Sequence, residues 1–181
     1  AGRPPKYRGT CRSIAPEEAR RRLDGGERGV IRFRVPEHTD VGFSDLVRGE
    51  VTFSTDVIGD PVLVRSDGRP AYNFAVVVDD ALMEVTHVIR GEDHISNTPR
   101  QVLLYRALGI TDRIPTYYHL PLVVGTDGRR LAKRHGDTRL SAYRDAGRSA
   151  GDILAVLAKW CGIDQAIGAA SASELLPHFD L

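Results

Sequence analysis

The sequence predicts a mixed α/β protein, and three observations lead to this class. The segment 86–89, in which three of four residues are β-branched, is followed by a polar turn and then by the signals of a helix start at 98–101. Residues 30–35 alternate cleanly between apolar and polar positions, and residues 1–70 together read as a β-rich unit with one helix. Residues 71–85 instead repeat apolar side chains at helical spacing. Strands and helices therefore both contribute to the predicted fold.

The stretch Thr86–Gly109 is the centre of this prediction. We expect Thr86–Ile89 to be a short buried strand and Arg90–His94 to be a charged turn at its end. In the next helix, Thr98 is expected at the N-cap and Gln101 three residues after it, with a proline between them at the first position. Ligands of open α/β sheets bind outside the carboxyl ends of strands, so the turn is the natural site. An ordinary solvated loop also fits the pattern.

Composition limits the class of protein. The chain has 181 residues, of which 41% are hydrophobic and 27% charged, as in ordinary soluble globular proteins. A net charge of +1 predicts no general affinity for nucleic acid, so any RNA contact must use local patches. No apolar run approaches the roughly 20 residues of a membrane span. There is no secretory signal, so a cytoplasmic location is expected, and two cysteines give no disulfide framework.

The first 70 residues are expected to contain one helix and several strands. The helix covers residues 16–23, and the strand at 30–35 buries Ile31, Phe33 and Val35. Its outward arginines, Arg32 and Arg34, could meet RNA phosphates or simply face water. Further elements are strands at 41–55 and 56–65 and a hairpin turn at 66–70.

The sequence after residue 70 is consistent with either a helix or a strand. Phe74, Val77, Val78, Ala81, Leu82 and Val85 follow a helical period, whereas the β-propensity of 74–78 favours a strand. We favour the helix because Asp79 and Asp80 then lie on its polar face.

The remaining elements follow from simpler signals. We expect a strand at 114–125, a turn at 126–129, helices at 140–146 and 150–161, and a last short helix beginning at Ser171–Glu174. Ser149 and Asp152 predict a capping box for the second helix. Its predicted buried face consists of Ile153, Leu154, Val156, Leu157 and Trp160.

Two sequence segments resemble those of a known family. VIRGEDHISNTPRQ, at residues 88–101, closely resembles a segment of the class I catalytic domain of glutamyl-tRNA synthetases. Residues 130–136, RLAKRHG, resemble the KLSKRHG form of that family's KMSKS loop, and the spacing between the segments also fits. The resemblance runs from about Pro4 to Leu181. Two positions depart from the family: Arg130 replaces a lysine, and Ala132 replaces a serine.

The resemblance implies an α/β fold with three parts. Residues 1–70 correspond to part of the acceptor-binding insertion, 71–128 to the second half of the Rossmann-type catalytic domain, and 129–181 to the KMSKS-like loop and the start of a helical stem-contact region. The HIGH tetrapeptide of the first Rossmann half does not occur in the sequence. We therefore expect a truncated catalytic region that is inactive alone.

The resemblance also implies roles for individual residues. Arg90 is expected to bind a carboxylate of glutamate, although from the pattern alone an ion pair with Glu92 or Asp79 is equally consistent. His119 is expected either to contact ATP or to be structural. The full set is Tyr72 and Arg90 for glutamate; Glu92, Asp93, His94, His119, Leu131 and Lys133 for ATP; Lys133 and Arg130 for catalysis; and Arg48 and Arg134 for tRNA. Arg90 and Lys133 are expected to converge on one pocket.

A metal site is not predicted from these residues. Tyr7 and Cys11 match the second half of a zinc arrangement that some family members carry, and two such ligands cannot complete a tetrahedral site. The cofactors implied are ATP and Mg²⁺, with zinc left open for a longer parent protein.

The function implied is ATP-dependent ligation of L-glutamate to tRNA(Glu) through a glutamyl-adenylate, by a monomer that needs no membrane. Three alternatives stay open: a relative that glutamylates a modified tRNA base, a shortened paralogue that binds the tRNA acceptor end, ATP or glutamate without catalysis, and a remnant with no ligand affinity. The altered KMSKS-like loop and the absent HIGH motif favour the second of these.

Overall fold

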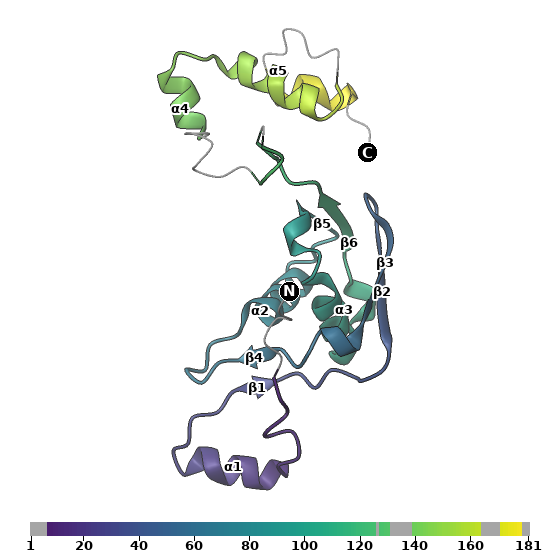
Figure 1. Ribbon diagram of the computed structural model, residues 1–181, viewed down its shortest axis with the longest axis vertical. Coiled ribbons are helices and arrows are strands. Elements are labelled where there is room, and N and C mark those ends of the chain that lie inside the picture. The colour runs from purple at the N-terminus through teal and green to yellow at the C-terminus, as the bar shows by residue number, and fades with distance from the viewer. Residues whose placement is uncertain (1–6, 126, 131–138, 164–170, 179–181) are drawn as a thin grey trace. The chain divides into compact units, whose positions relative to one another are not determined.

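The computed structural model describes residues 7–125, 127–130, 139–163 and 171–178. Contacts within the chain divide it into two units, residues 1–121 and residues 122–181 (Figure 1). Each unit is described by itself below.

The first unit is built on a four-stranded sheet with the strand order β3-β2-β6-β5. The strands are β2 (Asp40–Asp45), β3 (Gly49–Ser54), β5 (His87–Gly91) and β6 (Thr116–Leu120). β2 and β3 form an antiparallel hairpin, whereas β2 and β5 each run parallel to β6. Parallel neighbours need a crossover connection, and the helix α3 supplies it between β5 and β6 (Figure 1).

Two helices pack in succession on this sheet. α3 (Thr98–Ala107) contributes Val102 and Leu103 to a core cluster with residues of β2 and β6. Its next two residues, Leu104 and Tyr105, pack against α2 (Tyr72–Leu82). α3 is therefore buried between the sheet and α2, which explains why its sequence is apolar on more than one side.

The helical period predicted the structure of α2 correctly, against the β-propensity of its valines. Val77 and Ala81 are buried, while Leu82, which also belongs to the predicted stripe, is exposed. The prediction of a buried strand at 86–89 is wrong in one respect. β5 lies at the edge of the sheet, where β6 is its only partner among the described strands. Ile89 is 62% exposed, because alternation along β5 turns it to the face opposite that of Val88, which packs against the core.

The first 70 residues contain the helix α1 (Pro16–Asp24), as predicted. The strand expected at 30–35 shortens to β1 (Ile31–Arg32), which pairs with β4 (Val62–Val64) in a separate two-stranded sheet. Ile31 is exposed, contrary to prediction, whereas Val35 is buried. The turn at 66–70 is confirmed by backbone hydrogen bonds from Arg65 N–H to the Arg69 oxygen and from Gly68 N–H to the Arg65 oxygen.

The strand expected at 41–55 is in fact the hairpin of β2 and β3. Gly49 has a φ of 73°, a conformation that glycine adopts without strain, and it closes the turn after residues 46–48. A short 3-10 helix, η1 (Thr55–Val57), follows β3. Because β2 and β3 belong to the same sheet as β5 and β6, the predicted boundary at residue 70 does not coincide with a break in the sheet.

Two further 3-10 helices complete the first unit. η2 (Glu92–His94) follows β5 directly, and η3 (Thr111–Arg113) precedes β6.

The second unit contains α4 (Leu140–Asp145), α5 (Ala150–Trp160) and the 3-10 helix η5 (Ala172–His178). The capping box of Ser149 and Asp152 is confirmed. The predicted buried face of α5 is wrong: Val156, Leu157 and Trp160 are exposed, and Ala158 packs with Ile163 and Leu175 instead. Within the described part of the chain, no helix is long and apolar enough to cross a membrane.

Candidate functional site

Three neighbouring strands bring Asp45, His119 and Arg90 together beneath α3. Arg90 of β5 lies directly opposite His119 of β6, and Asp45 of β2 lies opposite Tyr117 of the same strand. Side chains two apart along a strand share a face, so these residues point to one side of the sheet. Asp45 and His119 are buried, the latter completely.

The guanidinium of Arg90 is held at two of its three nitrogens. Nε donates to Nε2 of His119 at 3.0 Å, and Nη2 donates to Oγ1 of Thr98 at 2.8 Å and to Oε1 of Gln101 at 2.9 Å. The guanidinium carbon also lies 5.6 Å from the centre of the Tyr117 ring. Nη1 has no hydrogen-bond partner among the described residues.

All direct partners of Arg90 are formally neutral. The ion pair with Glu92 or Asp79 that pattern alone allowed is absent from the described structure, where no carboxylate lies within 4.0 Å of this guanidinium. Burial raises the pKa of Asp80 and the charge of Arg90 partly offsets this, so Asp80 lies near the guanidinium without contacting it. The positive charge is therefore oriented without a carboxylate in direct contact, an arrangement suited to binding an anion.

His119 links Arg90 to Asp45. Its Nδ1 lies 2.6 Å from Oδ2 of Asp45, and its backbone N–H donates to the same oxygen at 3.1 Å. Since Nε2 accepts from Arg90, the neutral imidazole with its proton on Nδ1 satisfies both contacts. Burial lowers the pKa of His119, and the charge of Arg90 lowers it further, against the opposing effect of Asp45.

Asp45 is the one carboxylate in direct contact with this network among the described residues. Burial raises its pKa, but the hydrogen bonds from His119 and from the backbone N–H groups of Arg48 and Val47 outweigh burial, so that the pKa lies below its usual value. Asp45 is therefore an ionised, acceptor-only group. The network continues on the far side of Arg90, where Nε2 of Gln101 donates to Oδ1 of Asn73 at 3.1 Å.

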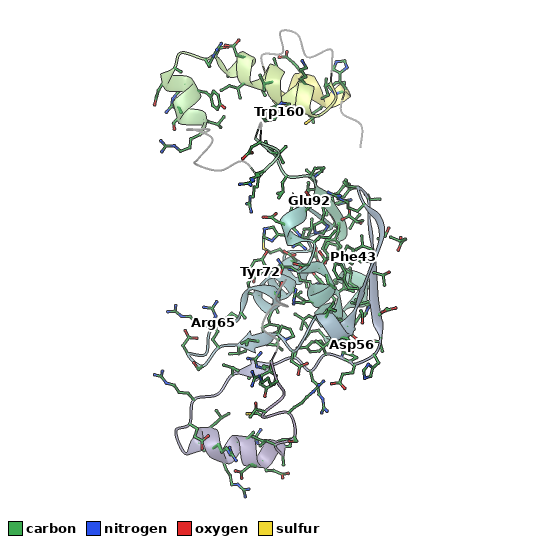
Figure 2. The ribbon with its side chains drawn as sticks, in the orientation of Figure 1. Phe43, Asp56, Arg65, Tyr72, Glu92 and Trp160 are labelled. Atoms are coloured by element: carbon green, nitrogen blue, oxygen red, sulfur yellow. The ribbon has the colours of Figure 1, made fainter. Side chains whose placement is uncertain are left out.

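A more exposed rim surrounds this buried network. Tyr72, at the start of α2, is 49% exposed, and its ring centre lies 6.4 Å from that of His94 in η2. Nδ2 of Asn97 lies 3.3 Å from Nδ1 of His94. Glu92 begins η2 (Figure 2) and forms an ion pair with Arg48 from the β2–β3 turn. Asp93 is exposed beside them.

The structure brings several predicted site residues together in the first unit: Tyr72, Arg90, Glu92, Asp93, His94, His119 and Arg48. His119 was left open between ATP contact and a structural role, and complete burial favours the structural role. Arg130 is exposed in the second unit. Leu131, Lys133 and Arg134 lie outside the described residues, so the convergence of Arg90 with Lys133 stays a prediction.

Thr98 does not cap α3, contrary to the sequence-based prediction. The N-cap is Asn97, without a side-chain capping bond, and the Thr98 hydroxyl contacts Arg90 and His119 instead. Gln101 likewise turns inward to Arg90 rather than back to the helix start. Two residues that were given capping roles therefore belong to the site.

Sequence reasoning missed Asp45 and Asn73 altogether. A signal for Asp45 was present, because alternation along β2 places it on the same face as Val41 and Phe43, which are buried. A carboxylate on a core-facing position needs a partner. Asn73 offered no comparable signal.

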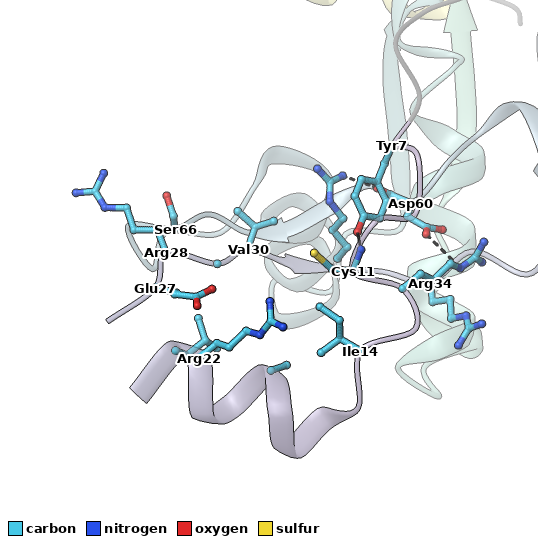
Figure 3. Close-up of a pocket in the computed structure, with 15 residues that line it drawn as sticks. Tyr7, Cys11, Ile14, Arg22, Glu27, Arg28, Val30, Arg34, Asp60 and Ser66 are labelled. Carbon is cyan, nitrogen blue, oxygen red and sulfur yellow. Dashed lines mark hydrogen bonds and ion pairs between the residues drawn. The ribbon is translucent and has the colours of Figure 1, made fainter. Parts of the chain in front are cut away.

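A second basic region lies near the N-terminal segment, and Figure 3 shows it. This arginine-lined hollow has a volume of about 630 Å³, and the arginines that line it are Arg12, Arg22, Arg28, Arg32 and Arg34. Tyr7 and Cys11 also line it, and the Tyr7 hydroxyl accepts a hydrogen bond from the Cys11 backbone at 2.7 Å. Tyr7 and Cys11 supply at most two of the four ligands that a structural zinc takes, and no group of three potential metal ligands occurs among the described residues.

Comparisons with known proteins agree with this architecture. The sequence model of a family described as "tRNA synthetases class I (E and Q), catalytic domain" matches residues 1–168. A glutamate–tRNA ligase of Aquifex aeolicus is 47% identical over 99% of this chain and 38% of the relative. Another, from Carboxydothermus hydrogenoformans, is 49% identical over 81% of this chain and 30% of the relative. The chain thus spans about a third of the length of these curated relatives.

The solved structures that resemble this chain include glutamate tRNA ligases. The crystal structure of a glutamate tRNA ligase from Elizabethkingia meningosepticum, in complex with its amino acid, superposes with a TM-score of 0.66. It is 37% identical in sequence, and the match covers 73% of this chain and 27% of that one.

Proposed function

Because the chain belongs to the class I tRNA synthetases of the glutamate and glutamine type, we propose that it forms part of the catalytic region of a glutamate–tRNA ligase. The observation that carries the proposal is the state of Arg90. Its guanidinium is fixed by three neutral side chains, and its Nη1 is left without a partner among the described residues.

Arg90 binds a carboxylate of L-glutamate in this proposal. A guanidinium and a carboxylate form a charge-assisted hydrogen bond that is stronger than one between neutral groups. Because Nε and both N–H groups of Nη2 are already used, the ligand contacts the N–H groups of Nη1. This differs from the two-nitrogen fork that is common for arginine. Tyr72 stands at the exposed rim as a second glutamate contact.

Activation of glutamate joins a carboxylate oxygen to the α-phosphorus of ATP and releases pyrophosphate. In a second step, a hydroxyl of the terminal ribose of tRNA(Glu) attacks the acyl carbon and AMP leaves. The protein contributes position and charge to both steps. Glu92, Asp93 and His94 contact the nucleotide in this proposal, while Arg48 contacts the tRNA once its pair with Glu92 opens.

The KMSKS-like loop supplies the positive charge that faces the phosphates of ATP. Lys133 places an ammonium over the β- and γ-phosphates, Arg130 and Arg134 flank it, and Leu131 borders the nucleotide. Mg²⁺ accompanies ATP in such reactions, yet the described residues contain no cluster of three or more metal-ligating side chains.

The test uses the complete reading frame that contains this sequence. With tRNA present, the protein is expected to exchange pyrophosphate into ATP when L-glutamate is added. Exchange that depends on L-glutamine instead would contradict the substrate proposed here, and exchange with neither amino acid would contradict the activity.

A non-catalytic binding protein is the second candidate, and the departures at Arg130 and Ala132 favour it. Calorimetric titration separates the two. Binding of glutamate or tRNA without any pyrophosphate exchange would support the binding protein, whereas glutamate-dependent exchange would exclude it.

A further inference from the structure

We propose that Asp45 and His119 are positioning residues that set the orientation of Arg90 toward its ligand. Neither residue touches the substrate in this proposal. Asp45 fixes which nitrogen of His119 carries the proton, and His119 then fixes the guanidinium. The identity of the ligand as glutamate depends on the function proposed above.

The first argument concerns the donors that surround Asp45. Its Oδ1 accepts from the backbone N–H groups of Val47 at 3.0 Å and Arg48 at 2.9 Å. Its Oδ2 accepts from the backbone N–H and the Nδ1 of His119 at 3.1 and 2.6 Å. Both oxygens therefore face donors only, and a group with two acceptor atoms is needed at this position.

The second argument concerns the tautomer of His119. With the Nδ1 proton directed at Asp45, Nε2 presents a lone pair, and Nε–H of Arg90 donates to it. If the proton moved to Nε2, two N–H groups would face each other at 3.0 Å. The bond from His119 to Asp45 therefore decides whether Arg90 can keep its place.

The third argument concerns charge. A carboxylate in direct contact with a guanidinium attracts it strongly and would cancel much of its field. Asp45 is separated from Arg90 by the whole imidazole ring. The arrangement anchors Arg90 firmly while it leaves the positive charge available to a ligand.

The main test is Asp45→Asn in the complete protein. The asparagine has one acceptor and one NH₂ group. If its oxygen keeps the Val47 and Arg48 bonds, its NH₂ faces His119 and moves the imidazole proton to Nε2. We expect ¹⁵N NMR of His119 to report this change of tautomer. The KM for glutamate should rise about ten- to a hundredfold, the range known for outer residues that orient metal ligands, while the KM for ATP changes less than twofold.

Gln101→Glu is the second variant, and it provides an independent test if Asp45→Asn does not fold. The new carboxylate keeps the size of glutamine and gives Arg90 a charged partner at the 2.9 Å contact. A purely structural role for the network predicts an unchanged KM. Positioning of the Arg90 charge for a ligand predicts a KM for glutamate at least tenfold higher, roughly the effect of changing one residue that orients a ligand. The new carboxylate cannot donate to Oδ1 of Asn73 as Nε2 of Gln101 does, so thermal unfolding is measured beside the KM to show that the variant is folded.

Thr55→Val is the matched control. Thr55 is also a buried polar residue whose hydroxyl bonds to Thr39, and it has no contact with Arg90. Its loss is expected to lower stability and to leave the KM for glutamate within twofold of wild type.

The outcomes separate this inference from the proposed function. If wild type performs glutamate-dependent exchange and the folded variants keep its KM for glutamate, the positioning role is refuted and the function stands. If wild type shows no such exchange, the function is refuted. The tautomer of His119 in Asp45→Asn then decides the positioning role: a proton that stays on Nδ1 overturns it.

Discussion

Arg90 and the arginine-lined hollow show two ways in which a protein can hold guanidinium groups. In the hollow, Arg22 pairs with Glu18 at 2.9 Å, and Arg12 pairs with Glu37. Arg32 donates to the backbone oxygen of Asp60 at 2.8 Å. By contrast, the single guanidinium of Arg90 is bonded to neutral groups and kept from its nearest network carboxylate by an imidazole ring.

The difference shows that a count of basic residues does not locate an anion site. Carboxylates in direct contact cancel much of the charge of two of the hollow's arginines, Arg12 and Arg22. Exposed ion pairs of this kind contribute little to stability. An arginine that neutral acceptors hold in place keeps its charge for a ligand and needs little reorganisation on binding. Four predictions test this contrast, from the largest expected effect to the smallest.

Arg90→Lys should nearly abolish use of glutamate. The ammonium cannot reproduce three directed contacts and a free nitrogen at once, so we expect a loss of at least 3 kcal/mol in transition-state stabilisation, about a hundredfold or more in kcat/KM. Pyrophosphate exchange at saturating tRNA measures it. The matched change in the hollow, Arg34→Gln, should leave the KM for glutamate within twofold. Equal losses in both variants would remove the distinction between the two regions.

Acid should destabilise the first unit through the buried network. The pKa of His119 is lowered on folding, so the unfolded chain binds a proton more readily, and stability falls as the pH drops below the ordinary histidine value of about 6.5. The pKa of Asp45 is also lowered, so its contribution, present above about pH 4, is lost as the pH falls further.

Urea unfolding between pH 7 and pH 3 measures this effect. His119→Gln should remove the decline between about pH 6.5 and 5, whereas His38→Gln, at an exposed histidine, should not. A wild-type stability that stays flat across this range would contradict the buried, neutral state assigned to His119.

Tyr105→Phe should stabilise the protein slightly. The Tyr105 hydroxyl is buried without a hydrogen-bond partner in the described structure, and burial raises its pKa to about 12. Removal of an unsatisfied buried group is expected to raise the free energy of unfolding by about 1 kcal/mol. Tyr105 belongs to the core cluster between α3 and α2, so the variant tests how a buried polar group without a partner affects stability in the first unit. A loss of stability would indicate a partner for this hydroxyl.

The ion pair of Arg48 and Glu92 should contribute least. Both side chains are more than a third exposed, and pairs of this kind typically couple by about 0.5 kcal/mol. A double-mutant cycle with Arg48→Gln and Glu92→Gln measures the coupling in unfolding free energy. A coupling of 2 kcal/mol or more would place this pair with the buried network rather than with the surface pairs of the hollow.

Much of the fold followed from periodicity and turn chemistry. The helical stripe identified α2 despite its valines, and the signals around Ser149 identified the start of α5. Burial was harder to predict, because the exposure of Ile89 depends on whether another element covers its face of β5, and that is a property of the whole fold. A local pattern carries no information about it.

The candidate site was predicted only in part, because local patterns do not report which distant residues meet. Arg90 stood out because it ends a strand within a charged turn, whereas Thr98 and Gln101 matched a helix cap so well that their second use was hidden. Asp45 lies 74 residues from its partner His119 in the sequence. Contacts at that distance arise from strand order, which the sequence pattern did not specify.

The most direct test of the central claim is a structure of the complete protein with L-glutamate bound. The account predicts a carboxylate oxygen of the ligand about 2.8 Å from Nη1 of Arg90, with the bonds from Nε to His119 and from Nη2 to Thr98 and Gln101 still in place. Glutamate bound away from Arg90, or a guanidinium that leaves His119 to reach the ligand, would contradict it.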